Sequence, residues 1–443
     1  MQKKNSFLYR ILHPDLRWFM PGIGIKRWIG VILIGTTFIG MGFAVLILDL
    51  YRNAPHAWWA SILAYLSLRS LDRIIRALIF GGIGLGLVLF GVWGLNKALL
   101  KPFIEPGRPI LDAVSAYRKK ERGPRIVVLG GGTGLSAMLR GLKTYSNNIT
   151  AIVTVADDGG SSGELRKNMG VLPPGDIRNC LAALSDDEAM LTQLFQYRFS
   201  TGTGLDGHTL GNLLITALTD LTGSFEKAVA ESGRVLAVKG RVIPATLHDI
   251  RLIADVRMPF KSRMKQIRGE SNIPEAAGQV RRVRLEPDNP KAFPPAIQAI
   301  LSADLIIVGP GSLYTSLLPN LLVPDIADAI QSSRALKFFV CNVATQPGET
   351  DGYNCDDHVV TIYKHLGNEI FDVIITNNHY EGQLPEGVSW VKPAEIQDIP
   401  FMIYASNLID PEKPWRHHSS RLAQVIIDLY NERTGPLVNR DEY

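Results

Sequence analysis

Residues 126–135 read IVVLGGGTGL, a short apolar run that ends in Gly130, Gly131, Gly132, Thr133 and Gly134. The run predicts a buried strand, and the residues after it predict a helix. Glycines at such a junction let backbone N–H groups approach phosphate oxygens at the positive end of the helix dipole. A tight turn without a ligand would show the same glycines. Leu135 replaces the third glycine of GxGxxG, so the loop departs from the usual dinucleotide fingerprint.

The chain after this loop alternates short β-branched runs with helical stretches. Further buried strands are predicted at residues 149–155, 305–308, 338–340 and 373–375. Helices are predicted near residues 135–144, 177–184, 188–199, 210–221 and 225–231. This alternation predicts a Rossmann-like α/β fold, a parallel sheet with helices on both faces.

The second predicted strand ends in a polar segment with the sequence Asp157-Asp158-Gly159-Gly160-Ser161-Ser162. Neighbouring parallel strands open into one crevice at their carboxyl ends. Two carboxylates there can hold a divalent cation, a sugar hydroxyl or a base, and the small residues after them can donate to phosphate. A solvated Asp-Gly turn is the alternative.

Two further segments supply candidate ligand contacts. Asp176 follows a rigid Pro-Pro-Gly turn and either caps the next helix or adds a third carboxylate. Arg178 can then clamp a phosphate beside Asn179. His208 and Asn212 lie one helical turn apart and can reach a shared ligand, although a lone histidine is more often structural.

Residues 304–316 read DLIIVGPGSLYTS, a second strand that runs into glycines and hydroxyls. Gly309, Gly311, Ser312 and Thr315 predict a second anion-binding nest. Two such loops in one sheet favour a nucleotide diphosphate or a nucleotide-sugar over a single phosphate. The polar segment at residues 342–350, NVATQPGET, follows a later strand.

The N-terminal region contains two uncharged apolar runs, at residues 29–48 and 77–95. Each is long enough to cross a hydrocarbon core of about 30 Å. Together with the flanking Lys and Arg residues, they predict a two-span hairpin and a multi-pass protein of the cytoplasmic (inner) membrane, with its main domain in the cytoplasm. Gly82 and Gly86 can pack the spans or pair protomers in a homo-oligomer. The expected divisions are residues 1–96 for the tail and hairpin, 97–123 for a linker and 124–443 for the α/β domain.

Charge is distributed unevenly. Residues 1–125 hold 18 Lys or Arg and 6 Asp or Glu, so the basic pI of 9.0 describes this end and does not indicate a nucleic-acid partner. Residues 234–284 hold 12 basic and 4 acidic residues. Strands predicted at residues 234–242, 251–256 and 280–285 make residues 234–285 a basic β-rich insertion. It is either a lid over an anionic ligand, a solvated arm or a protomer contact.

The 3 cysteines form no CxxC pair, which excludes a disulfide framework or a zinc ribbon and fits a reducing compartment.

Taken together, the motifs resemble those of the gluconeogenesis factor family, in the CofD-like group named for 2-phospho-L-lactate transferase. The matching segments are GGGTGLS, DDGGSSGELR, PPGDIRN, HTLGNLL, GPGSLYTSLLPNLL and CNVATQPGETDGY. The resemblance covers about residues 125–430. It implies a Rossmann-like protein that binds a nucleotide-sugar such as UDP-N-acetylglucosamine. It also implies a regulatory role in carbon metabolism, cell shape and wall synthesis during gluconeogenic growth, with regulatory partners that the motifs do not name.

The transferase branch implies an alternative, a metal-dependent transfer of a phosphate-containing group from a nucleotide diphosphate. By this resemblance, Asp157, Asp158 and Asp176 would hold Mg²⁺, and the loop at residues 309–315 would take the nucleotide. The first loop departs from that branch, with GGGTG in place of a GGxGGA-like run. An NAD(P)-linked dehydrogenase is disfavoured, because the glycine loop is altered and no acid/base pair for hydride transfer stands out.

Overall fold

The computed structural model describes residues 71–100, 120–121, 123–186, 189–202, 204–258, 264–276, 278–393 and 402–435, with isolated residues between 34 and 68. The chain divides into two compact units, Met1–Arg118 and Lys119–Tyr443. The first unit contains the helix α4 (Arg73–Leu100).

The membrane prediction is corrected by the structure. Among the described residues, no helix is both long enough and apolar enough to cross a membrane. Most of the first predicted span, residues 29–48, and most of the predicted linker, residues 97–123, lie outside the described residues. This finding contradicts the predicted multi-pass location, and the predicted two-span hairpin has no support among the described residues.

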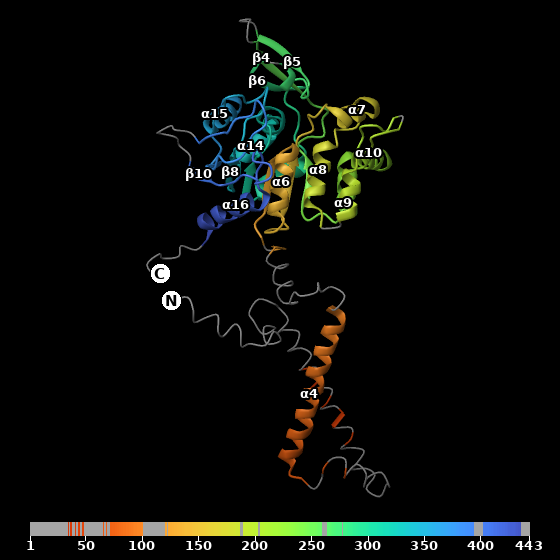
Figure 1. The fold of residues 1–443 in the computed structure, drawn as a ribbon. Helices are drawn as coiled ribbons and strands as arrows, with labels where there is room; N and C mark the ends of the chain where they lie inside the picture. Colours follow the sequence, from red (N-terminus) through yellow and green to blue (C-terminus); the bar gives the residue numbers. More distant parts are fainter. Residues whose placement is uncertain are drawn as a thin grey trace, which may run out of the picture. The chain divides into compact units, whose positions relative to one another are not determined.

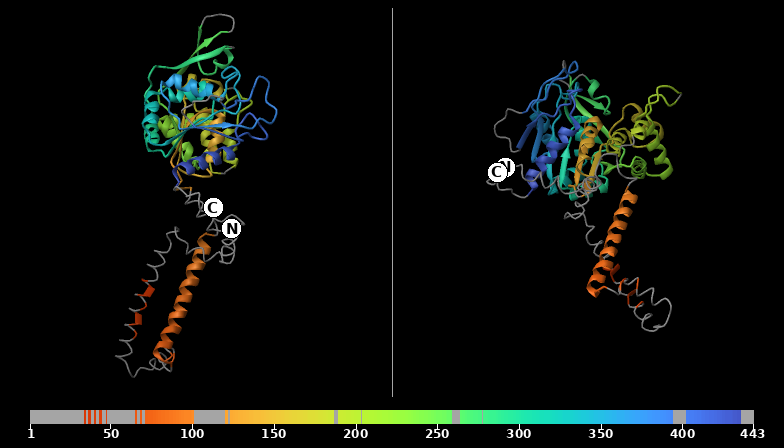
Figure 2. Two further views of the ribbon diagram at one scale, coloured as in Figure 1. Left: turned by 90° about the vertical axis from the view of Figure 1, so that its left-hand side faces the viewer. Right: turned by 60° about the horizontal axis from the view of Figure 1, so that its bottom comes forward.

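The second unit is built on a seven-stranded sheet with the order β10-β9-β8-β7-β1-β2-β3, in which every pair of neighbouring strands is parallel. The strands are β1 (Ile126–Gly130), β2 (Ile149–Val153), β3 (Arg241–Pro244), β7 (Leu305–Val308), β8 (Leu336–Val340), β9 (Val373–Asn377) and β10 (Met402–Ser406). Strand β1 lies between β2 and β7, and all five of its residues are buried. Continuous apolar runs form these strands because helices cover both faces (Figures 1 and 2). The predicted Rossmann-like α/β fold is confirmed.

Helix α6 follows β1 and packs against α8 and α16, while α12 packs against α14. The helices of this unit are α6 (Gly132–Leu142), α7 (Gly160–Met169), α8 (Gly175–Leu184), α9 (Ala189–Gln196), α10 (Leu210–Thr222), α11 (Phe225–Val235), α12 (Pro294–Ser302), α13 (Leu318–Leu321), α14 (Pro324–Ser332), α15 (Cys355–Leu366) and α16 (Ser419–Thr434). A π-helical turn, η4 (Leu313–Leu317), precedes α13, and a short 3-10 helix, η3 (Pro274–Ala276), precedes β6.

The strand order reverses beside β1. From β1 the chain adds β2 and β3 on one side, then returns to add β7, β8, β9 and β10 on the other. The carboxyl ends of β1 and β7 therefore flank a topological switch point, where ligands bind in open α/β sheets. Both glycine loops follow these two strands.

The predicted insertion is a separate antiparallel sheet of β4 (Arg251–Arg257), β5 (Met264–Arg268) and β6 (Gln279–Glu286), in the order β5-β4-β6 (Figure 1). Its predicted first strand, residues 234–242, is placed differently. Residues 225–235 are helical in α11, and β3 pairs with β2 in the main sheet. The insertion therefore begins after β3, because β3 pairs in parallel with β2 and belongs to the seven-stranded sheet.

Candidate functional site

The first glycine loop places the start of α6 at the switch point. Gly131 is the N-cap residue of α6 and has no side chain to cap the helix. Backbone N–H groups at a helix start carry a partial positive charge and attract anions. Gly132 has a φ of +66°, a conformation that favours glycine. The turn therefore exposes backbone donors where β1 ends.

The second glycine loop lies directly against the first. A Cβ atom on Gly134 would lie 2.8 Å from the carbonyl oxygen of Pro310 and 3.3 Å from the amide nitrogen of Gly311. Ser312 is the N-cap residue of η4, and it too makes no side-chain capping bond. The two loops therefore form one surface of backbone and hydroxyl groups, assembled from chain segments far apart in sequence.

The segment after β8 holds the second loop in place. Asn342 exchanges two hydrogen bonds with Gly311: its Oδ1 accepts from the amide of Gly311 at 3.2 Å, and its Nδ2 donates to the carbonyl at 2.9 Å. Gln346 donates from Nε2 to Ser312 Oγ at 2.6 Å. Glu349 accepts from Thr315 Oγ1 at 3.1 Å. Three side chains of residues 342–350 thus position the loop.

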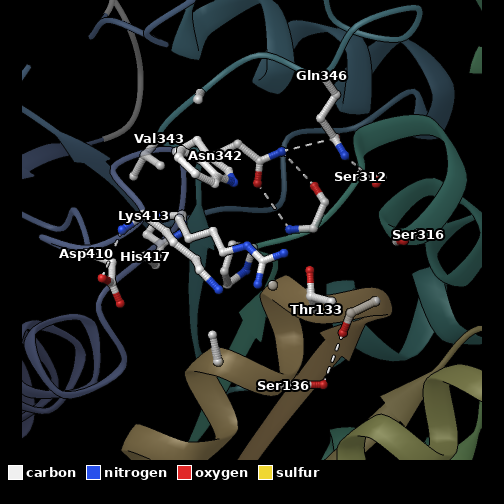
Figure 3. A pocket seen from close by; sticks show the side chains of 18 of the residues that line it. Thr133, Ser136, Ser312, Ser316, Asn342, Val343, Gln346, Asp410, Lys413 and His417 are labelled. Carbon is white, nitrogen blue, oxygen red and sulfur yellow. Dashed lines mark hydrogen bonds between the residues drawn. The ribbon is translucent and has the colours of Figure 1, made fainter. Parts of the chain in front are cut away.

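A cavity of about 750 Å³ opens over the two loops. In Figure 3, Thr133 and Ser136 on α6 face Ser312 and Asn342, and Lys413 lies on a further side. The wall comes from the two glycine loops, the segment at residues 342–347, the starts of α8 and α10, and the loop at residues 410–417. Its volume is in the range of ordinary ligand pockets.

The cavity wall is basic. Its lining includes Arg140, Arg178, Arg198, Lys413 and Arg416, against the acidic side chains Asp410 and Glu412. Burial and the charge of Arg198 hold the pKa of the Arg178 guanidinium below its usual value. Arg178 donates to Thr209 Oγ1 at 2.5 Å, and its Nε, also buried, has no hydrogen-bond partner. An anion in the cavity would offset the repulsion between Arg178 and Arg198.

The three predicted metal ligands lie behind the first loop and do not line the cavity. Asp176 lies against Gly131, whose Cβ would come within 2.5 Å of its Oδ2. Asp157 Oδ1 accepts from the amide of Gly159 at 2.9 Å. Asp158 Oδ1 accepts from the amide of Ser271 at 2.9 Å, so it holds the turn that follows β5. Each carboxylate thus has a partner within the protein.

Two more acids, which the sequence did not indicate as site residues, lie near these aspartates. Burial and the charge of Asp157 raise the pKa of Glu270 to about 8, and burial raises that of Glu349 to about 7. Burial and the charge of Asp157 likewise raise the pKa of Asp176 to about 6. Among the described residues, no three His, Cys, Asp or Glu side chains are grouped so as to hold a metal ion. Mg²⁺ at Asp157, Asp158 and Asp176 stays a prediction.

Several predicted ligand residues form a buried network instead of lining the cavity. Ser161 Oγ contacts His208 Nδ1 at 2.9 Å and accepts from Asn212 Nδ2 at 3.0 Å. His208 Nε2 lies 3.2 Å from a carboxylate oxygen of Glu164. Ser162 accepts from the amide of Gly175 at 3.1 Å. His208 and Asn212 thus share Ser161 as their partner, and this network ties the start of α7 to the start of α10.

The predicted site residues divide into two groups. Those that line the cavity are Gly131, Gly132, Thr133, Gly134, Arg178, Asn179, Gly311 and Ser312. Those that lie outside its lining are Gly130, Gly159, Gly160, Ser161, Ser162, His208, Asn212, Gly309 and Thr315. Thr315 is buried and donates its hydroxyl proton to Glu349, so it supports the loop.

Sequence reasoning missed two parts of the wall. Arg140 and Arg198 carry no local motif. Arg140 lies on α6, and Arg198 follows α9 and pairs with Thr209. The loop at residues 410–417 follows the last strand and reads DPEKPWRH, which resembles an ordinary polar loop. The polar segment at residues 342–350, after β8, can be recognised in the sequence. Because the carboxyl ends of parallel strands lie at one edge of the sheet, this rule would have placed the segment at the site.

No residue of β4, β5 or β6 lines the cavity among the described residues. The part of the insertion nearest the predicted acidic residues is the turn with Glu270 and Ser271, which is not basic. The lid interpretation has no support at this cavity, and the lid, the solvated arm and the protomer contact all stay predictions.

A parallel α/β sheet with a basic cavity at its switch point defines a Rossmann-like class of protein. The family model described as 2-phospho-L-lactate transferase CofD matches residues 126–392. Together with the relatives below, this match shows that the chain belongs to the CofD-like gluconeogenesis factor family.

The relatives fall into two kinds. A protein of Nostoc sp. is 46% identical over 449 residues, covering 97% of this chain and 95% of the relative. The protein of Bacillus subtilis named gluconeogenesis factor is 44% identical, covering 70% of this chain and 99% of the relative. A crystal structure of a UPF0052-family protein from Bacillus halodurans is 43% identical, with a TM-score of 0.65, and covers 69% of this chain and 99% of that one. About 70% of this chain therefore matches a complete shorter relative.

Proposed function

We propose that this chain binds a nucleotide-sugar of the UDP-N-acetylglucosamine type in the 750 Å³ cavity. In this role it acts as a regulatory protein in carbon metabolism, cell shape and wall synthesis during gluconeogenic growth. The observation that carries the binding proposal is the pair of apposed glycine loops at the starts of two helices, beside a basic wall. Two helix starts supply donors for two phosphates, and the arginines supply the balancing charge.

Isothermal titration calorimetry of the full chain tests the binding. We expect UDP-N-acetylglucosamine to bind more tightly than inorganic pyrophosphate, and both affinities to fall with rising salt, because the arginines of the wall are screened. Absence of binding by any nucleotide-sugar would refute the proposal. In cells, a strain lacking the gene should grow poorly on gluconeogenic carbon sources, and the intact gene should restore growth.

The metal-dependent transferase is the second candidate, and the CofD match favours it. Titrations with GDP and UDP-N-acetylglucosamine, each with and without Mg²⁺, separate the two candidates. The regulatory proposal expects binding of the nucleotide-sugar without Mg²⁺, since the aspartates have other partners. Strict dependence on Mg²⁺, lost in Asp176→Asn, would instead support the transferase and its metal site.

A further inference from the structure

The cavity has two sides of different chemistry, separated by the glycine loops. Strand order puts the segments after β2 on one side of β1 and β7, and the segments after β8, β9 and β10 on the other. The first side is lined by the polar residues Arg178, Asn179, Gln196, Arg198 and Thr209. Of the two sides, only the second, termed the apolar side, carries apolar residues, which lie beside charged ones such as Glu412, Lys413 and Arg416. These apolar residues are Val343, Ala344, Pro347, Pro385, Val388 and Trp415. A ligand whose phosphates lie at the glycine loops would thus find apolar contacts on one side only.

The loop that carries Trp415 is held rigidly. Ile409 and His417 pair across its base, and Asp410 Oδ1 accepts from the amides of Glu412 and Lys413 at 2.9 and 3.2 Å. His417 is buried, and its Nε2 lies 3.1 Å from the carbonyl oxygen of Cys341, at the end of β8. Burial lowers the pKa of His417 to about 4, so a neutral ring donates this bond at neutral pH. The loop is therefore fixed before any ligand arrives.

Trp415 lies on this loop and is one of the residues that line the cavity. It is 37% exposed, although it is large and apolar. Among the described residues that line the cavity, it is the one aromatic side chain besides the imidazole of His417. A planar heteroaromatic ring that stacks on an exposed indole removes apolar area from water and gains π-contacts.

We infer that Trp415 and the apolar side of the cavity bind the nucleobase, while the side with Arg178 and Arg198 binds the sugar end of the ligand. This inference rests on the proposed function and assigns the two ends of its nucleotide-sugar. A base has two apolar faces and suits the apolar side, whereas a sugar presents hydroxyl groups around its ring and suits the polar side. The loop at residues 410–417 lies beyond the 126–392 match to the transferase model, so this base wall is separate from the matched region.

Substitution of Trp415 tests the inference by calorimetry. Stacking on one base is worth about 1–3 kcal/mol, which corresponds to a loss of about fivefold to a hundredfold in affinity. Trp415→Ala should weaken UDP-N-acetylglucosamine and UDP by that factor and leave inorganic pyrophosphate within about twofold. Trp415→Phe, which keeps a stacking ring, should stay within about threefold for all three probes.

Tryptophan fluorescence supplies a second readout. Binding of UDP should quench the emission of the wild-type chain, because the base covers an exposed indole. The quench should vanish in Trp415→Phe and persist in Trp390→Phe, the matched control, since Trp390 lies outside the cavity lining.

Three outcomes would overturn the inference. The first is unchanged UDP affinity in Trp415→Ala. The second is an equal loss for pyrophosphate, which would indicate damage to the fold. The third is a wild-type chain that binds pyrophosphate but no base-containing ligand, which would also refute the proposed function. If the wild type binds another nucleotide in a Trp415-dependent way but no nucleotide-sugar, the base wall stands and only the proposed function fails.

Discussion

The two sides of the Gly131–Gly132 turn carry opposite charges. In front of it, the cavity is lined by Arg140, Arg178 and Arg198. Behind it, Asp176 lies against Gly131 and accepts a hydrogen bond from the amide of Gly132. One backbone turn therefore separates a group of cations from a group of carboxylates.

The two groups differ in how their charge is balanced. The acids behind the turn have raised pKa values because they are removed from water and lie near one another. Bound protons and hydrogen-bond donors of the protein can balance the negative charge of these acids. The cations in front lie around an open cavity. Arg178 donates to Thr209 and Asn179, which are neutral, so its charge has no carboxylate hydrogen-bonded to it. We therefore expect an anionic ligand to bind on the basic side, whereas protons and hydrogen bonds within the protein balance the charge of the carboxylates.

The largest effect is expected from Gly134→Ala. The new methyl group would meet the backbone of Pro310 at 2.8 Å and push the two glycine loops apart. We expect a loss of about 1–3 kcal/mol in the free energy of unfolding. Binding of pyrophosphate should fall at least about a hundredfold, since donors on both loops are displaced and each bond to a charged group is worth about 1.5–3 kcal/mol.

Urea unfolding and calorimetry measure these changes, with Gly233→Ala in helix α11 as the matched control. Its Cβ would meet Leu181 at 3.6 Å, an ordinary contact, so stability should be unchanged or rise by up to about 1 kcal/mol. Normal pyrophosphate binding by Gly134→Ala would show that the contact between the loops does not shape the site.

An intermediate effect is expected from Arg178→Gln. The change removes a charge and at least one donor from the basic wall, so affinity for pyrophosphate should fall about tenfold to a hundredfold. The salt dependence of binding should weaken in parallel, as fewer charges are screened. Calorimetry at two salt concentrations gives both values. An unchanged salt dependence would mean that Arg178 serves only to pack against α10.

The smallest effect is expected on the acidic side, from Glu349→Gln. In the folded chain the pKa of Glu349 is raised from 4.5 to about 7, so the folded state binds more protons than the unfolded state between these values. Stability from this group is therefore present at low pH and lost as the pH rises from about 5 to 8. Each pKa unit corresponds to about 1.4 kcal/mol.

The unfolding free energy, measured at pH 5 and pH 8, checks this sign. The decrease between the two should be smaller in Glu349→Gln than in the wild type, by about 1 kcal/mol or more. The amide can still accept from Thr315, so the loop should keep its place. An equal decrease in both proteins would show that Glu349 is ionised in the folded state without penalty.

The sequence was sufficient for five of the seven strands of the sheet and for the glycine loops. The apolar run of β1 and the glycines after it are local patterns, and local patterns report on the backbone around them. The predicted membrane hairpin found no support, since no helix among the described residues is long and apolar enough to cross a membrane. The predicted insertion was also too long at its start. The sequence of β3 indicates a short strand but not its partner, and β3 pairs with β2 in the main sheet.

The cavity depends on which distant segments meet. The sequence alone determined that Gly131 and Gly311 follow buried strands and open helical turns. Only the tertiary structure decided that β7 lies beside β1 and that Asn342 hydrogen-bonds to Gly311. It also decided that Asp158 accepts a hydrogen bond from Ser271 and that Trp415 lines the cavity. The physical reason is that each of these contacts joins residues far apart in the chain, and strand order and packing bring them together, whereas a motif records only its own few residues.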